Sequence, residues 1–102
     1  MNKTKNEICL WRDRIDKIDL ELVQLLNKRA NCAKIIGKLK LKLGDPVLAP
    51  DREKEVIQNV TAANSGPLSA KAIKCIFQRI IKESRSVEQV MNEECKEKGK
   101  SL

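Results

Sequence analysis

The sequence predicts an all-α fold of three helices, in the order long, short, long. In three stretches of the chain, apolar residues recur at intervals of three and four, which is the spacing of one helix face. Two turn-forming segments, Gly-Asp-Pro at residues 44–46 and Asn-Ser-Gly-Pro at residues 64–67, separate these stretches. No stretch alternates apolar and polar residues as a strand does. With 102 residues, 41% of them hydrophobic, the chain is long enough for one domain.

The first helix is expected from about residue 8 to residue 43. Its apolar face consists of Ile8, Trp11, Ile15, Ile18, Leu22, Leu25, Cys32, Ile36 and Leu43. A helix of this length spans roughly 54 Å at about 1.5 Å per residue, whereas a compact chain of about 100 residues has a radius of gyration of only about 13 Å. The helix must therefore project from a single chain with its apolar face uncovered. We predict an intertwined homodimer in which the long helices share one core.

The second and third helices have recognisable starts. Pro50 and the acidic residues after it favour a helix that begins there and ends near Asn64. Ser69 is a good N-cap for the third helix. The apolar residues of the third helix are Ile73, Ile76, Phe77, Ile80, Ile81, Val87 and Met91. Residues 1–92 are therefore expected to form the helical domain, and the polar residues 93–102 a frayed tail.

Charge and composition limit the possible functions. Lysine and arginine outnumber aspartate and glutamate by 21 to 14, so the formal net charge is +7, which suits an anionic partner. The chain has no histidine, which excludes histidine general-base chemistry, Ser-His and Cys-His nucleophiles and His-ligated metal sites. We expect no metal site. One Trp, one Phe and no Tyr provide few stacking groups for nucleic acid, and no basic recognition motif is present.

The cysteines and the N-terminus predict a cytoplasmic protein. No CxxC spacing occurs, so neither a zinc ribbon nor a redox motif is expected. Residues 1–7 are polar and no apolar segment of a signal peptide follows them, which predicts a reducing compartment and four free thiols. Cys9, Cys32 and Cys75 lie among apolar residues and are expected in the core. No apolar run approaches the roughly 18 residues of a membrane span, so no membrane contact is expected.

Polar residues interrupt the apolar faces of all three helices. At about 100° per residue, Arg29 and Lys40 fall at the centre of the apolar face of the first helix. Glu53 is in phase with the apolar residues of the second helix, and Ser84 and Glu88 with those of the third. Burying an unpaired cation is very costly, so each cation needs an anion or a route to water.

Two interpretations account for these inward-facing groups. Buried ion pairs such as Arg29–Glu53 or Lys40–Glu88, retained for register or dimer specificity, would explain any one of them. Five polar groups together, with a surplus of positive charge, favour a pocket within a helical bundle that binds a small dianion. Two further arginines are notable: Arg12 lies on the flank of the apolar face of the first helix, beside Trp11, and Arg52 lies next to Glu53.

The same residues carry a family resemblance. The matching motifs lie at residues 11–19 (WRDRIDKID), 25–29 (LLNKR), 36–40 (IGKLK), 50–56 (PDREKEV), 64–68 (NSGPL), 76–77 (IF) and 80–89 (IIKESRSVEQ). In this order and at these spacings they resemble the all-helical chorismate mutases, over about residues 8–90. The resemblance implies conversion of chorismate to prephenate, on the route to phenylalanine and tyrosine, by an intramolecular [3,3] rearrangement without a cofactor. It also implies an intertwined dimer of three-helix chains in which each active site borrows an arginine from the partner.

The resemblance also implies roles for individual residues. Arg29 and the partner's Arg12 would clamp the two substrate carboxylates, and Ser84 would bind near the ring carboxylate. Lys40 would donate to the ether oxygen and to a carboxylate, and Glu88 would face Lys40 across that oxygen. Lys40, Glu88 and Arg29 are thus the implied catalytic residues.

The ring-hydroxyl region contains one of two departures from the family pattern. Glu53 would hold the hydroxyl and Arg52 would support that region. Ala49 stands where some members have Asp, so this side-chain contact is absent. Glu88 stands where some members have Gln, and a carboxyl donates a hydrogen bond only when it is protonated, whereas an amide donates at any pH.

Three other interpretations remain open. An isochorismate-pyruvate lyase shares the fold and the shape of the substrate, and product analysis separates the two enzymes. A basic helical module that binds nucleic acid would explain the charge, and its retention on DNA would depend strongly on salt. A non-catalytic helical dimerisation module with buried ion pairs would tolerate replacement of Arg29 or Lys40 by Met.

Overall fold

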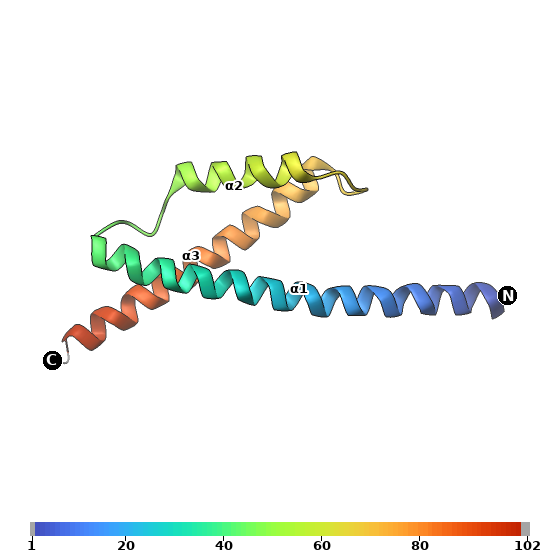
Figure 1. The fold of residues 1–102 in the computed structure, drawn as a ribbon, viewed down its shortest axis with the longest axis horizontal. Helices are drawn as coiled ribbons and strands as arrows, with labels where there is room; N and C mark the ends of the chain where they lie inside the picture. The colour runs from blue at the N-terminus through green and yellow to red at the C-terminus, as the bar shows by residue number, and fades with distance from the viewer. Residues whose placement is uncertain (1, 101–102) are drawn as a thin grey trace.

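The described part of the chain forms three helices, as the sequence predicts (Figure 1). The structure, a computed structural model, describes the backbone of residues 2–100 and the side chains of residues 2–91 and 93. The helices are α1 (Asn2–Leu43), α2 (Pro50–Ala63) and α3 (Ala70–Lys100). The predicted all-α class and the long, short, long order are confirmed.

Two helix ends differ from the expected bounds. α1 begins at Asn2 rather than near residue 8, because polar residues can extend a helix without adding to its apolar face. The backbone of α3 is helical as far as Lys100, within the segment expected to be a tail. The side chains of residues 94–102, Cys95 included, lie outside the described part of the chain, so the expected fraying of this tail stays a prediction.

Local hydrogen bonds explain where the helices begin and end. Gly44 has a φ of +73°, and the backbone amides of Gly44 and Asp45 donate to the carbonyls of Leu41 and Lys40 at 3.2 and 2.9 Å. This is the glycine-terminated pattern that ends many helices. The backbone amide of Ala72 donates to Ser69 Oγ at 3.1 Å, which confirms the predicted cap of α3.

The three helices do not form a compact globule. α3 contacts both other helices and crosses the C-terminal half of α1, while the N-terminal half of α1 extends beyond them (Figure 1). The molecule measures 68 × 30 × 14 Å, and its radius of gyration is 18.8 Å. A compact chain of this length has a value of about 13 Å. The predicted projection of the first helix is therefore confirmed.

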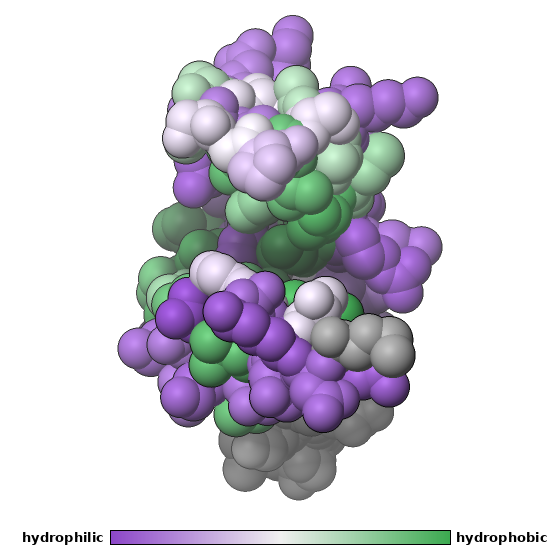
Figure 2. All heavy atoms as spheres, turned by 90° about the vertical axis from the view of Figure 1, so that its right-hand side faces the viewer, coloured by the Kyte–Doolittle hydropathy of each residue, from purple (hydrophilic) through white to green (hydrophobic). Residues whose placement is uncertain are grey.

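Most large apolar side chains of α1 are exposed in the single chain. They include Ile8, Trp11, Ile15, Ile18, Leu22, Leu25, Ile36 and Leu43. Only Ala33, Ile81 and Met91 are buried hydrophobic residues in the described part of the chain. Apolar surface is also visible between the α2 layer and α1 when the molecule is seen from the end where α1 begins (Figure 2). The single chain thus leaves an apolar surface that a partner can cover.

The expected burial of the cysteines is wrong for this single chain. Cys9, Cys32 and Cys75 are free and exposed, because the faces that carry them are not covered by other elements of the same chain. Within the described range, none of the helices has a stretch that is both long and apolar enough to cross a membrane.

Candidate active site

A cavity of about 230 Å³ brings together six of the seven predicted site residues. Its walls come from α1, the loop before α2, the first turns of α2 and the middle of α3. The six residues are Arg29, Lys40, Arg52, Glu53, Ser84 and Glu88. The seventh, Arg12, lies on the N-terminal half of α1 and does not line this cavity.

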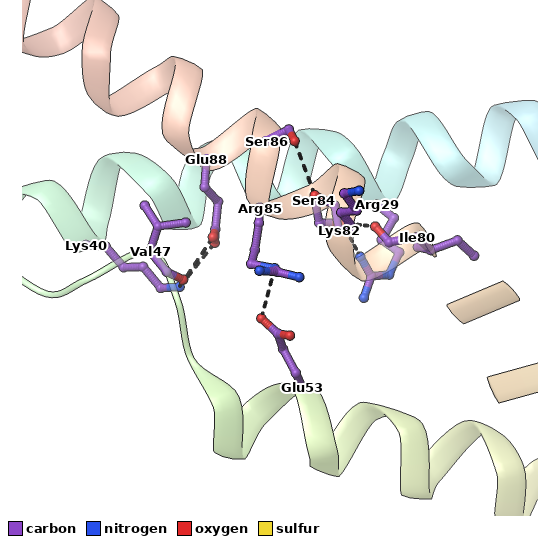
Figure 3. Close-up of polar contacts among 10 residues, drawn as sticks. All are labelled: Arg29, Lys40, Val47, Glu53, Ile80, Lys82, Ser84, Arg85, Ser86 and Glu88. Atoms are coloured by element: carbon purple, nitrogen blue, oxygen red, sulfur yellow. Dashed lines mark hydrogen bonds and ion pairs between the residues drawn. The ribbon is translucent and has the colours of Figure 1, made fainter. Parts of the chain in front are cut away.

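Lys40 and Glu88 face each other at one end of the cavity (Figure 3). The Lys40 ammonium lies 3.3 Å from Glu88 Oε1, donates to Glu88 Oε2 at 3.4 Å, and donates to the Val47 carbonyl at 2.8 Å. Glu88 is only 7% exposed, so this carboxyl depends on the protein for its polar contacts. An ammonium has three N–H donors. With one directed to the carboxyl and one to Val47, Lys40 retains a donor for a ligand.

Gly37 allows the two helices to come this close. A β-carbon on Gly37 would lie 3.0 Å from the Cα of Glu88 and 3.1 Å from its carbonyl oxygen, tighter than ordinary van der Waals contact. The absence of a side chain at Gly37 therefore brings the backbone of α3 against α1 at Glu88. Lys40 lies about one turn after Gly37 in α1, and its ammonium contacts the Glu88 carboxyl.

Arg29 and Ser84 form the opposite wall (Figure 3). Arg29 Nη1 donates to Ser84 Oγ, and that hydroxyl donates in turn to the Ile80 carbonyl at 3.0 Å. Among the described side chains, no carboxylate forms an ion pair with Arg29. A planar guanidinium has five donors arranged to hold a carboxylate by two hydrogen bonds. Arg29 is therefore a cation in the cavity whose charge no side chain of the described part neutralises.

Glu53 is paired with Arg85, a residue that the sequence analysis missed. Glu53 Oε2 lies 3.2 Å from Arg85 Nε, and both side chains line the cavity. A signal was available, because Arg85 follows Ile81 by four positions and precedes Glu88 by three, which places all three on one face of α3. The ion pair Arg29–Glu53, suggested by the structural interpretation, does not form, whereas the suggested pair Lys40–Glu88 does.

Arg52 and Ala49, near the start of α2, line the cavity but supply no carboxylate to it. Arg52 lines the cavity, but its guanidinium pairs with Glu55, and both side chains are exposed. Ala49 also lines the cavity and provides no carboxylate there. Glu53 is therefore the acidic group that α2 presents to the cavity.

The electrostatics of the cavity suit an anionic ligand. Four cationic side chains and two carboxylates line it: Arg29, Lys40, Arg52 and Arg85, with Glu53 and Glu88. Lys40, Arg52 and Arg85 are each paired with a carboxylate, so Arg29 is the cation whose charge no described side chain balances. Apolar residues, among them Ile36 and Ile81, form the rest of the wall. Charged donors act more strongly in such a place than in bulk water.

Comparison with known proteins points to one family. Residues 11–89 match the family described as chorismate mutase type II. The bifunctional chorismate mutase/prephenate dehydratase of Aquifex aeolicus is 37% identical over 86 residues, which are 80% of this chain and 24% of that protein. The enzyme of the same name from Neisseria gonorrhoeae is 36% identical over 89 residues, which are 86% of this chain and 24% of that protein. The chain thus spans about a quarter of the length of these relatives.

A solved structure agrees with this result. Chorismate mutase (form II) from Thermus thermophilus superposes with a TM-score of 0.80 and 34% sequence identity, over 81% of this chain and 94% of that one. The family match extends over all the motifs that line the cavity, from α1 to the middle of α3. The chain belongs to the chorismate mutase type II family.

Proposed function

We propose that the chain is an isomerase that converts chorismate to prephenate, within phenylalanine and tyrosine biosynthesis in the cytoplasm. The observation that carries the proposal is the cavity, in which Arg29 has no carboxylate partner among the described side chains and the Lys40–Glu88 pair keeps a free donor. Family membership supports the same reaction. The guanidinium of Arg29, which no described carboxylate neutralises, suits one carboxylate of the substrate.

The reaction is an intramolecular rearrangement in which a C–O bond breaks while a C–C bond forms. The protein has to hold the substrate in a compact conformer and stabilise the negative charge that develops on the ether oxygen. Holding the conformer is an orientation effect, which clamps on both carboxylates provide. Stabilising the oxygen is electrostatic preorganisation by donors that already point at it.

Arg29 and Ser84 hold one end of the substrate in this proposal. Arg29 binds a carboxylate through the guanidinium donors that its contact with Ser84 leaves free. The hydroxyl of Ser84 is directed by its bond to the Ile80 carbonyl, so its oxygen faces Arg29 and fixes the guanidinium. The second substrate carboxylate is bound by the partner's Arg12.

Lys40 and Glu88 act on the ether oxygen. The third N–H of Lys40 donates to this oxygen, while the other two remain on Glu88 and Val47. Glu88, when protonated, donates to the same oxygen from α3. Because both groups lie in place in the free chain, the transition state requires little reorganisation of the protein.

The ring hydroxyl is held on the other side of the cavity by Glu53, whose carboxylate accepts its hydrogen bond. Arg52 supports this region from the same turn of α2. Ala49 contributes no carboxylate, so Glu53 is the acceptor that α2 offers to the hydroxyl.

A homodimer completes the site in this proposal. The apolar face of α1 is exposed along its length, including Trp11, Ile15 and Ile18 on the projecting half. Burial of apolar surface is worth roughly 25 cal/mol per Å², so a second copy that packs on this face stabilises both chains. With the projecting halves exchanged, each cavity receives an arginine from the partner's α1. The partner's Arg12 is then the second carboxylate clamp.

The test is turnover of chorismate by the purified chain, produced in cells that lack a chorismate mutase of their own. Loss of the ultraviolet absorbance of chorismate, with prephenate identified by chromatography, supports the proposal. Pyruvate and salicylate formed from isochorismate would assign the chain to a lyase instead. Turnover of neither compound by a folded helical dimer would overturn the proposal, and salt-dependent retention on DNA would then favour a nucleic-acid-binding module.

A further inference from the structure

Arg85 forms the ion pair that joins α2 to α3 across the cavity (Figure 3). Its Nε lies 3.2 Å from Glu53 Oε2, and no other polar side-chain contact between these two helices is found among the described side chains. The side chains are 38% and 26% exposed, so the pair lies at the cavity wall rather than on the open surface. The resemblance to the family assigns no role to Arg85.

The geometry of this pair does not suggest a purely structural contact. The Nε–H of Arg85 is buried but is not aligned on the carboxylate, so that donor has no hydrogen-bond partner among the described residues. Buried donors are nearly always satisfied in folded proteins, and the exceptions often mark functional groups.

The neighbouring arginine does not hold Glu53. Arg52 precedes Glu53 in the sequence, but its guanidinium pairs with Glu55 on the exposed side of α2. Glu53 therefore receives its cationic partner from α3. The recorded contact between the two side chains is made at Oε2 of the Glu53 carboxylate.

We propose that Arg85 is a positioning residue that holds the Glu53 carboxylate so that Oε1 accepts the ring hydroxyl of the substrate. Through Glu53, Arg85 determines specificity for a substrate that carries this hydroxyl. The inference rests on the proposed function. It predicts that the effect of removing Arg85 depends both on Glu53 and on the hydroxyl.

Kinetic constants distinguish this role from a structural one. The hydroxyl takes no part in the bonds that break and form, so its contact with Glu53 is present in the ground state and in the transition state alike. Losing such a contact raises KM and leaves kcat nearly unchanged. A hydrogen bond to a charged group contributes strongly to binding, so we expect its loss to raise KM about 10- to 100-fold. A general loss of active protein would lower kcat instead.

The experiment compares Arg85→Met, Arg85→Lys, Glu53→Gln and the double variant Arg85→Met/Glu53→Gln. Each variant is measured for kcat and KM with chorismate, and for competitive inhibition by an analogue in which hydrogen replaces the ring hydroxyl. Arg79→Met is the matched control, because Arg79 lies on the same helix and pairs with Glu83 at 3.0 Å on the exposed surface. Thermal unfolding and molecular mass confirm that each variant is folded.

The proposal predicts that Arg85→Met raises KM for chorismate but changes the inhibition constant of the analogue by less than about twofold. Arg85→Lys should raise KM for chorismate less than Arg85→Met does, and Arg79→Met should have the kcat and KM of the parent chain. In the Glu53→Gln background, Arg85→Met should have little further effect, since coupled residues are not additive.

Two results would overturn the inference. Equal loss of affinity for chorismate and for the analogue would mean that Arg85 contacts another part of the ligand. Fully additive losses in the double variant would mean that Arg85 acts independently of Glu53. Failure of the proposed function is distinguishable from both, because the parent chain itself would then not turn over chorismate.

Discussion

The Cα of Glu88 lies 3.0 Å from the position that a β-carbon on Gly37 would occupy. This close approach of α3 to α1 determines where the Glu88 carboxyl meets Lys40 Nζ, 3.3 Å away. The neighbouring atoms at Gly37 are backbone atoms of Glu88, which cannot rotate away as a flexible side chain can. Helix packing and the geometry of the Lys40–Glu88 pair are thus linked through one glycine.

Gly37→Ala should therefore destabilise the chain and reduce its activity. Alanine favours a helix over glycine by up to about 1 kcal/mol, but an added methylene in a tight contact costs about 1–3 kcal/mol. We expect a net loss of up to about 2 kcal/mol in the free energy of unfolding. Thermal unfolding measures the loss, and kcat should also fall because Glu88 moves away from Lys40.

Gly66→Ala is the control for this substitution. A β-carbon on Gly66 would meet no atom within 4 Å, so this variant should match the parent chain in stability and activity. If Gly37→Ala were as stable and as active as the parent, α1 and α3 would be able to separate without cost. The close approach at Gly37 would then have no role in the site.

Lys40→Ala should lower kcat at least about a hundredfold, the usual effect of losing one donor to a developing oxyanion. The predicted cause is the loss of the ammonium that faces Glu88 and retains a donor for the ether oxygen. Steady-state kinetics with chorismate provide the measurement. Lys42→Ala, an exposed neighbour in the last turn of α1, is the matched control. A near-native kcat for Lys40→Ala would disprove the assignment.

Glu88→Gln should change the dependence of activity on pH. The carboxyl donates a hydrogen bond only in its protonated form, and the protonated fraction falls as pH rises. Activity of the parent chain should therefore fall as pH rises. The glutamine amide donates at any pH, so the fall should disappear in the variant. Profiles of kcat against pH measure the difference, and identical profiles would exclude Glu88 as a donor.

The sequence predicts the helices well because the signals that start and end them are local. Pro50 begins α2, Ser69 caps α3, and Gly44 ends α1 in the left-handed conformation that favours glycine. Periodicity also identifies Arg29 and Lys40 as polar residues on an otherwise apolar face. The structure brings both to one cavity because helix geometry alone determines which residues share a face.

The periodicity of apolar residues does not predict which side chains form ion pairs across the cavity. Two cations, Arg29 and Arg85, lie on helices that face Glu53, and the one that pairs with it depends on how far α2 lies from α3. That distance results from packing among many side chains and has no local signal. The prediction that Cys32 is buried is wrong for a related reason. A periodic pattern identifies an apolar face, but it does not identify the chain that covers this face.

A final prediction tests whether each site borrows an arginine from the other chain. Arg12→Ala and Arg29→Ala should each be nearly inactive alone, because each removes one carboxylate clamp from every site. In a mixed dimer, the chain with Arg12→Ala keeps its own Arg29 and receives an intact Arg12 from its partner. One of the two sites is then complete. Random exchange makes half of the dimers mixed, so about a quarter of the parent activity should return.

Mixing Arg29→Ala with Lys40→Ala is the matched control. Both residues line the cavity of their own chain, so every site in that mixed dimer lacks one of them and no activity should return. In this control, each substituted residue serves the cavity of its own chain. In the first mixture, Arg12 instead serves the cavity of the partner chain. Recovery in neither mixture, with subunit exchange verified by mass, would exclude a site shared between chains. Recovery only with Arg12→Ala would establish that the projecting half of α1 completes the partner's site.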